Sequence, residues 1–580
     1  MKRLGGFARR FLVHRRRLAL GILCIPLVTA GEIQITVLIG DALTRLRQGD
    51  DPAFLRGLFL LLLAVAAAQG LFRFLQRHLL VGVSRFFERD LKQDLFDKLV
   101  RLSFTFHGRS RTGDIVSRLT SDVENLRMLL GPGMMYVLSA VVLVPGSMIV
   151  LLRISPAMTL AMAVPLLLVA VTMKALTPRL HEHSTAVQES LAEIGHRAQE
   201  SFAGIRVVKG YGLAEHENEG FAAISAANRG HQVALARARG WSQSLINLSY
   251  DLAFLPILFV GGWAMIDRSL AVGDLFKFID LGFKVFWPVI AFGWIAGLYP
   301  RALASAERIE ALLGETAEVA EDADPVALAA VRGELALRGV AFTYPGAPRP
   351  AVAGVTVDVP AETTLGVVGP TGAGKSTLLH LLGRLYEASG EIRLDGTPIR
   401  RLSLSTLRGA LAYVPQDSFL FSDTYRENVA FGAEEPLDDP ALAALIERAE
   451  MAAEVADFAG GYDQRIGERG VTLSGGQRQR TCIARALARD PRILILDDAL
   501  SAVDTETEVR LLRSLREAGR KRTMVIAAHR LATVAHAEEI LVLREGRVEA
   551  QGTHAELLER SDWYRRTWER QRMAKELAEL

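Results

Sequence analysis

The chain has 580 residues, which at roughly 150 residues per domain corresponds to about three or four domain equivalents. Half of the residues are hydrophobic and 23% are charged, so disorder, collagen and coiled coil are excluded as the main state. Two cysteines, Cys24 and Cys482, cannot form a disulfide framework. The formal net charge of +3 gives no reason to expect a nucleic-acid partner.

Long apolar segments are concentrated in the N-terminal half of the chain. A bilayer core of about 30 Å needs roughly 20 mostly apolar residues per helix. For any single segment a buried core helix is the alternative, but this does not explain six segments in one half. We therefore predict an all-α domain over residues 1–315 with six spans: Leu18–Ile39, Leu55–Gly70 with its continuation, Tyr136–Leu152, Pro156–Leu176, Leu245–Met265 and Leu275–Leu298.

The charges that flank the first predicted span indicate its orientation. Only basic charges precede it, whereas the loop that follows carries Asp41, Asp50 and Asp51 against two arginines. By the positive-inside rule the N-terminus is cytoplasmic, and six crossings return the chain to the cytoplasm. The segment is too long for the core of a signal peptide, so we predict a retained span.

Two long polar connections lie between the predicted spans, at Gly82–Leu130 and Pro178–Gly240. Both are almost free of proline, which predicts helices that continue out of the membrane into the cytosol. We expect them to turn at Thr112–Leu119 and at Ser201–Tyr211. Short helices at these turns would dock on a cytoplasmic domain, or would simply be solvated.

The C-terminal part is predicted to be an α/β domain over residues 336–580, after an acidic linker at 316–335. Its strongest motif fits GxxxxGK[ST], a P-loop, between the predicted strand Leu365–Val368 and the predicted helix Thr377–Leu385. Backbone N–H groups and a helix N-terminus would bind phosphate oxygens, Lys375 would reach the β/γ phosphates and Ser376 would offer a hydroxyl to Mg²⁺. The motif comprises Gly369, Pro370, Thr371, Gly372, Ala373, Gly374, Lys375, Ser376 and Thr377.

Two further elements indicate nucleotide chemistry. A second apolar strand, Ile493–Leu496, ends in Asp497 and Asp498, and ligands of doubly wound sheets bind at the carboxyl ends of strands. Asp497 would hold Mg²⁺, and Asp498 is placed for a base or water-positioning group. The segment Leu473–Gln477 opens the predicted helix Arg478–Ala488 and would form another anion site, unless it is a plain glycine turn.

On these motifs the whole chain resembles an ATP-binding cassette exporter half-transporter, with six spans fused to one nucleotide-binding domain. Gly369–Thr377 resembles the Walker A loop, and Asp497 resembles the Walker B aspartate. The other matches are Tyr344, similar to the aromatic residue that stacks on adenine; Gln416, similar to the Q-loop glutamine that contacts Mg²⁺; Ser474, Gly475, Gly476 and Gln477 of the signature motif; Asp504 of the D-loop; and His529, similar to the switch histidine.

The resemblance implies ATP and Mg²⁺ as cofactors and a second half-transporter as partner. In the family, ATP lies between the Walker A loop of one nucleotide domain and the signature motif of the other. ATP binding closes the dimer, and hydrolysis resets it. The resemblance also implies a multi-pass protein of the bacterial inner membrane that exports hydrophobic or amphipathic small molecules, with the nucleotide domain and both termini cytoplasmic.

The chain departs from the family at Asp498, where glutamate is usual. Aspartate is one methylene shorter, so its carboxylate would lie roughly 1.5 Å back from the attacking water, and a misplacement of about 1 Å can cost on the order of a hundredfold in rate. With His529 and the signature motif intact, this pattern resembles the degenerate-site subunit of a heterodimeric exporter. A homodimer that tolerates aspartate is the alternative.

Four charged residues lie at or near bilayer depth: Glu32, Asp251, Asp280 and Lys284. Such groups are costly in a membrane and are functional by default. Asp280 and Lys284 are four residues apart and would neutralise each other. Glu32 and Asp251 would pair with other helices or lie near an interface, unless they contact substrate. Glu32 is the best candidate for contact with a cationic amphiphile. Besides drug efflux, the sequence leaves open a flippase for lipids or lipid-linked molecules, and a mainly ATP-binding regulatory subunit.

Overall fold

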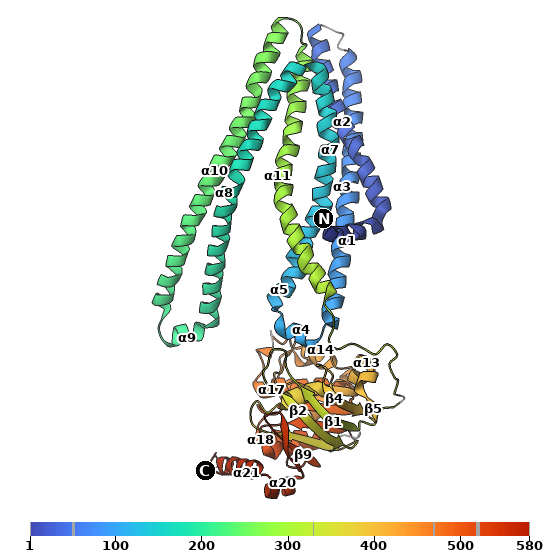
Figure 1. Ribbon diagram of the computed structural model, residues 1–580, viewed down its shortest axis with the longest axis vertical. Helices are drawn as coiled ribbons and strands as arrows, with labels where there is room; N and C mark the ends of the chain where they lie inside the picture. Colours follow the sequence, from blue (N-terminus) through green and yellow to red (C-terminus); the bar gives the residue numbers. More distant parts are fainter. Residues whose placement is uncertain (1, 49–52, 329, 468–469, 518–521, 579–580) are drawn as a thin grey trace. The chain divides into compact units, whose positions relative to one another are not determined.

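The computed structural model describes residues 2–48, 53–328, 330–467, 470–517 and 522–578 (Figure 1). The chain forms two compact units, which are described separately. The first contains Met1–Val100 and Thr112–Glu315, and the second contains Arg101–Arg111 and Thr316–Leu580. The short segment Arg101–Arg111 therefore belongs to the second unit, although the first unit precedes and follows it in sequence.

The first unit consists of helices joined by short turns. Its principal helices are α1 (Lys2–Phe11), α2 (Arg15–Gln48), α3 (Ala53–Arg101), α5 (Thr112–Ser117), α6 (Val123–Met128), α7 (Met134–Ile154), α8 (Pro156–Ala203), α9 (Ile205–Gly210), α10 (Ala214–Ile266) and α11 (Val272–Gly314). Two π-helical turns, Arg118–Asp122 and Leu129–Gly133, join α5, α6 and α7 into one continuous rod. Each π turn adds a residue to a helical turn and so adjusts the direction of the rod without ending it.

Four of the helical segments are long and apolar enough to cross a membrane: Gly5–Gln48, Phe54–Arg101, Thr112–Ile154 and Val272–Gly314. They contain the first, second, third and sixth predicted spans. The fourth and fifth predicted spans lie within α8 and α10, which are continuous helices of 48 and 53 residues. At about 1.5 Å per residue both are much longer than a bilayer core, as expected for helices that extend into the cytosol.

The two predicted cytoplasmic turns differ in outcome. The chain turns between α8 and α10 through the short helix α9, within the predicted Ser201–Tyr211. The other prediction is wrong in position, because Thr112–Leu119 is helical and continues into α6 and α7. The turn lies about ten residues earlier, where α3 ends at Arg101 and α4 (Phe104–Arg109) follows.

Helices α2 and α11 approach each other closely at Gly40 and Gly273. A Cβ atom on Gly273 would overlap the Gly40 carbonyl, and the Gly273 N–H donates to Thr44 Oγ1 at 3.2 Å. Small residues allow this approach, and close backbone packing is a main source of helix association in membranes.

We expect Gly273→Val to destabilise the first unit, because the new side chain must push the two helices apart. Overpacking of this kind costs about 1–3 kcal/mol or more. Thermal unfolding in detergent should show a lowered midpoint. Gly57→Val on α3 is the matched control, since a Cβ there meets no atom within 4 Å. Equal midpoints for the two variants would contradict the packing role of Gly273.

The second unit contains two sheets. The smaller is antiparallel with the strand order β2-β1-β4-β5. In the larger, β9, β3, β8, β7 and β6 are parallel in that order, and β10 pairs antiparallel with β9. The strands are β1 (Leu335–Phe342), β2 (Val352–Val359), β3 (Thr364–Val368), β4 (Ser389–Leu394), β5 (Thr397–Pro398), β6 (Leu411–Val414), β7 (Ile493–Asp497), β8 (Thr523–Ala527), β9 (Glu539–Arg544) and β10 (Arg547–Gly552).

The helices of the second unit that follow α4 are α12 (Lys375–Leu382), α13 (Leu404–Ala410), α14 (Tyr425–Ala430), α15 (Asp439–Arg448), α16 (Ala452–Ala456), α17 (Gly475–Ala488), α18 (Thr505–Glu517), α19 (Leu531–Val534), α20 (His554–Arg560) and α21 (Asp562–Ala578). Of these, α12, α13, α17, α19 and α20 contact strands of the larger sheet, whereas α14 and α15 pack on α17. The strands β3, β7 and β8 are buried along their whole length, as central parallel strands are. The predicted strands at Leu365–Val368 and Ile493–Leu496 are confirmed, and so are the helices that follow the P-loop and the segment Leu473–Gln477.

Candidate functional site

Four neighbouring parallel strands end at one edge of the large sheet, and each leads into a predicted site segment. The strand β3 leads into Gly369, β7 ends at Asp497, β8 leads to His529, and β6 is followed by Pro415 and Gln416. Ligands of open α/β sheets bind outside the carboxyl ends of the strands. The topology therefore brings these four segments together, although more than 150 residues separate the first from the last.

The phosphate loop connects β3 to α12. Gly369, Gly372 and Gly374 have φ values of 153°, 79° and 98°, which only glycine adopts readily. Gly374 has no room for a side chain, because a Cβ would overlap the carbonyl of Ala351. The loop is thus a backbone structure whose N–H groups precede a helix N-terminus, the usual arrangement for binding phosphate.

Lys375 is the first residue of α12 and is 7% exposed. Its ammonium donates to the carbonyl oxygens of Gly369 at 2.9 Å and Pro370 at 3.2 Å, so it lies folded over the loop. Burial lowers the pKa of Lys375, while the charges of Asp498 and Asp497 act in the opposite direction. A bound phosphate chain would supply the negative charge that this buried cation lacks.

Asp497 accepts two hydrogen bonds at the end of β7. Ser376 Oγ donates to Oδ1 at 2.9 Å, and the Tyr413 hydroxyl donates to Oδ2 at 2.8 Å. Burial, together with the charge of Asp497, raises the pKa of Tyr413, which therefore stays a neutral donor. Tyr413 was not among the residues predicted from the sequence. The pairing of β6 with β7 brings it to Asp497, so a prediction of that strand pairing would have identified it.

Asp498 has a left-handed backbone conformation with φ 47°. Its N–H donates to the Ala527 carbonyl at 2.9 Å, and its own carbonyl accepts the Ser501 hydroxyl at 2.8 Å. The backbone N–H of His529 donates to Asp498 Oδ1 at 3.4 Å. Non-glycine residues in this region are uncommon and concentrate at functional sites, and aspartate tolerates the conformation better than most.

The segment that begins α17 forms a capping box. Ser474 Oγ accepts the Gln477 N–H at 3.2 Å, and Gln477 Oε1 accepts the Ser474 N–H at 2.9 Å. Gly475 and Gly476 therefore follow a rigid, exposed helix start. Both glycines lie against Ala502, because a Cβ atom on Gly475 or Gly476 would meet atoms of that residue within 3.2 Å.

The remaining predicted residues surround the phosphate loop or the D-loop. The Tyr344 hydroxyl lies 3.1 Å from Thr377 Oγ1, and its ring packs edge-on against Phe342 and Tyr386. The Gln416 side chain is exposed. Asp504 accepts the Thr507 N–H at 2.9 Å at the start of α18, and this hydrogen bond lowers the pKa of the Asp504 carboxyl.

Aromatic contacts connect α4 to Tyr344. Phe104 packs against Tyr386 and His380 with ring centroids 5.8 and 6.0 Å apart, and Tyr386 in turn contacts Tyr344. Thr105 Oγ1 also donates to Glu318 at 2.6 Å. Burial lowers the pKa of His380, so it contributes a neutral ring to this cluster.

Three of the four charged residues predicted at bilayer depth have charged partners: Asp280, Lys284 and Glu32. Lys284 Nζ lies 2.6 Å from Asp280 Oδ2 and donates to Thr36 Oγ1 on α2 at 2.6 Å. Glu32 is 3.5 Å from Arg73 of α3, as expected if it pairs with another helix. Asp251 lies exposed on α10.

Family models match both parts of the chain, and relatives match most of its length. The family model described as ABC transporter transmembrane region matches residues 18–289, and the model described as ABC transporter matches residues 352–501. The chain is 36% identical over 503 residues to the multidrug resistance-like ATP-binding protein MdlA of Escherichia coli, covering 86% of this chain and 85% of the relative. It is 33% identical over 514 residues to the ATP-dependent lipid A-core flippase of Methylococcus capsulatus, covering 88% and 84%.

A solved structure is similar over nearly the whole length. It is described as a bacterial Atm1-family ABC exporter with ATP bound. The similar region covers 96% of this chain and 98% of the chain in that structure. The sequence identity is 28% and the TM-score is 0.77. The similarity therefore includes both the helical unit and the α/β unit.

Proposed function

The chain belongs to the ABC exporters, and on that premise we propose that it exports hydrophobic or amphipathic compounds as one half of a dimer. It is an ATP-hydrolysing membrane transporter by family. One observation carries the more specific proposal. Four candidate membrane spans lie among the described residues. In the same chain, Lys375, Asp497 and His529 follow or end neighbouring strands at one edge of the large sheet.

We propose that the phosphate loop and Lys375 bind the ATP phosphates, that Tyr344 stacks on adenine, and that His529 contacts the γ-phosphate. Ser376, Asp497 and Gln416 would hold Mg²⁺, which neutralises phosphate charge when bound. A hydroxyl and a carboxylate only 2.9 Å apart are a suitable donor set for this ion. Asp504 of the D-loop would contact the partner chain.

The exposed capping box of Ser474 and Gln477 supports a site shared between two chains, because it leaves the N-terminus of α17 open to a ligand held by the partner. The signature segment of this chain would complete the ATP site of its partner, and the partner's would complete this one. The paired helices α8 and α10 also support a dimer. They diverge from the other helices of their unit (Figure 1). On α10, the large apolar side chains of Trp241, Phe259 and Trp263 are exposed. A partner or lipid would cover that surface.

Asp498 would make this chain's own site slow, because its carboxylate is one methylene short. We therefore favour a heterodimer with a paralogous half-transporter that has glutamate at this position. A homodimer that tolerates aspartate, and a mainly regulatory ATP-binding subunit, are the alternatives. The basic residues before the first span support cytoplasmic nucleotide domains and termini at a bacterial inner membrane.

A second candidate function, the export of lipids or lipid-linked molecules, is favoured by one groove of the first unit. A cavity of about 740 Å³ between α3 and the start of α7 is lined by Arg73, Arg77 and His78 together with Phe74 and Tyr136. Cations beside aromatic rings on an apolar helix suit an amphiphile with an anionic group.

ATPase stimulation in proteoliposomes tests both candidate functions. The chain and its paralogous partner are reconstituted together, and cationic drugs and anionic lipids are titrated in parallel. We expect amphiphiles to raise ATPase several-fold. Stimulation by anionic lipids that Arg77→Gln removes would support the flippase, and stimulation only by drugs would support efflux. No stimulation by either class would contradict an exporter of amphipathic compounds.

Phe104→Ala should uncouple transport from ATP binding, because it removes the ring through which α4 contacts Tyr386 and His380. We expect substrate transport to fall several-fold while ATP affinity stays within twofold. Phe96→Ala removes a ring that is 57% exposed on α3 and serves as the control. Undiminished transport by the Phe104 variant would count against a coupling role for α4.

A further inference from the structure

We propose that Gln571, on the C-terminal helix α21, is a positioning residue that holds the loop containing His529. Its side-chain amide makes two hydrogen bonds to the backbone of that loop. Nε2 donates to the His529 carbonyl at 2.9 Å, and Oε1 accepts the Leu531 N–H at 2.9 Å. One side chain therefore satisfies the peptide groups on both sides of Arg530. The inference rests on the proposed contact of His529 with the γ-phosphate.

The same loop is fixed on its other side by Arg530. The guanidinium donates to the carbonyl oxygens of Ser501 and Val503 and forms an ion pair with Glu508 at 3.1 Å. Glu508 is 5% exposed and also accepts from Thr533. Arg530 thus connects the loop to the D-loop and to α18, whereas Gln571 connects it to α21. Together they fix the loop from two directions.

The path from Gln571 to the reacting groups is short. The His529 carbonyl accepts from Gln571, and the His529 N–H donates to Asp498 Oδ1. A shift of the His529 peptide therefore moves the imidazole and also releases a contact of the Asp498 carboxylate. Displacements of about 1 Å at such groups are costly for phosphate chemistry.

Helix α21 is anchored independently of Gln571. Tyr564 is fully buried, its hydroxyl lies 2.8 Å from His554 Nδ1, and Trp568 packs edge-on against the same histidine. Tyr564, Trp568 and Gln571 lie on one face at helical spacing. Beyond Gln571 the helix is exposed, with Met573 at 58% and Leu577 at 73%.

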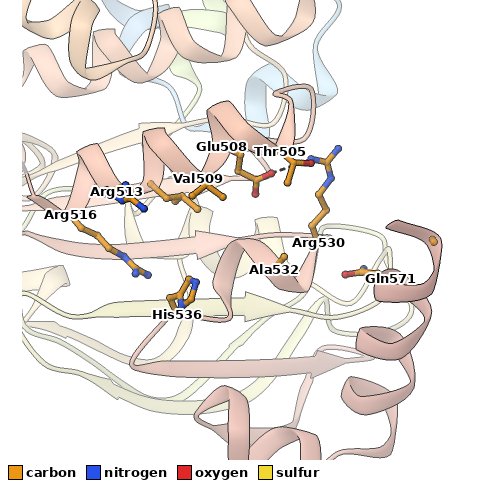
Figure 2. Close-up of a pocket in the computed structure, with 11 residues that line it drawn as sticks. Thr505, Glu508, Val509, Arg513, Arg516, Arg530, Ala532, His536 and Gln571 are labelled. Atoms are coloured by element: carbon orange, nitrogen blue, oxygen red, sulfur yellow. Dashed lines mark hydrogen bonds and ion pairs between the residues drawn. The ribbon is translucent and has the colours of Figure 1, made fainter. Parts of the chain in front are cut away.

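Gln571 borders a cavity on the side that faces α18. A cavity of about 830 Å³ lies between α18, the residues after His529 and the end of α21, with Gln571 and Ala574 on its wall (Figure 2). At this level the cavity lies between α21 and α18. Helix α21 also packs against α19, and the two hydrogen bonds of Gln571 add direct contacts to the backbone of the His529 loop.

The test is the preference for a γ-phosphate at this chain's own site. Purified full-length chain is titrated with a non-hydrolysable ATP analogue and with ADP, and the ratio of the two affinities is measured. Only the ATP analogue has the phosphate that His529 would contact. We expect Gln571→Ala to lower this ratio about fivefold to tenfold, the range for losing a positioning hydrogen bond. Affinity for ADP should stay within twofold.

Three further variants separate positioning from packing and from the proposed function. Gln571→Met keeps the side-chain volume but loses both bonds, and it should match Gln571→Ala. Tyr564→Phe weakens the anchoring of α21 without touching the loop; it should lower the unfolding midpoint and keep the ratio. His529→Ala should lower the ratio as well. A normal ratio in Gln571→Met, with the ratio lost in His529→Ala, would overturn the inference.

A second measurement does not depend on His529. Hydrogen exchange of the peptide that contains Leu531 should be several-fold faster in Gln571→Met than in wild type, and unchanged in Tyr564→Phe. If His529→Ala keeps the affinity ratio, the proposed role of the histidine is wrong, and exchange alone decides whether Gln571 holds the loop. An exchange rate in Gln571→Met equal to that of the wild type would contradict the proposal that Gln571 holds the loop.

Discussion

Ser474→Arg should abolish most of the ATPase activity of the assembled transporter. Ser474 begins α17, and its hydroxyl and the following glycines form an exposed helix start that would face the ATP of the partner chain. A bulky cation there would occupy the place of the γ-phosphate. We expect steady-state phosphate release by the reconstituted complex to fall at least about tenfold, which corresponds to about 1.4 kcal/mol or more.

Thr553→Arg is the matched control for loss of the helix cap. Thr553 forms the same kind of capping box at the start of α20, with Glu556 as its partner. Losing either cap should cost about 1 kcal/mol of stability. Only the Ser474 variant should lose ATPase activity. Comparable activity of the two variants would show that Leu473–Gln477 is a structural turn and not part of an ATP site.

Lys375→Ala should weaken ATP binding by about tenfold to a hundredfold. It removes a buried cation whose charge-assisted hydrogen bonds to phosphate would each contribute about 1.5–3 kcal/mol. Tyr344→Ala, which removes one face of the adenine site, should cost about tenfold through lost stacking. Photo-crosslinking with an ATP analogue measures both. Undiminished labelling in both variants would mean that the nucleotide binds elsewhere.

Much of the α/β unit could be predicted because its motifs are local. The phosphate loop needs glycines at particular φ values and a helix directly after it, so Gly369–Thr377 fixes its own structure. Apolar strands that end in polar residues likewise predicted where β7 ends and that Asp497 lies at the sheet edge. Once the strands are parallel, the meeting of Gly369 and Asp497 follows.

The contacts that the sequence did not predict depend on tertiary packing. Tyr413 donates to Asp497 only because β6 pairs with β7. Gln571 reaches the loop of His529 only because α21 is anchored through the buried Tyr564. Likewise, Arg73 meets Glu32 only where α2 and α3 run side by side. None of these pairs leaves a signal in local spacing.

The turn predicted at Thr112–Leu119 was misplaced for a local reason. The segment is helical, and the π-helical turn that follows it at Arg118–Asp122 continues the helix. The chain instead breaks at Leu102 and Ser103, where Ser103 adopts an extended conformation before α4. A serine before a short apolar helix was the better indicator of the turn.

We propose that this chain's own ATP site is slow and that its signature segment completes a fast site in the partner. Steady-state ATPase of Asp498→Asn and Ser474→Arg, measured side by side in the assembled transporter, tests it most directly. Asp498→Asn should reduce turnover only modestly, since the partner's site carries it, and Ser474→Arg should remove most of it. Equal and complete loss in both variants would contradict the claim, because Asp498 would then be catalytic and the transporter a working homodimer.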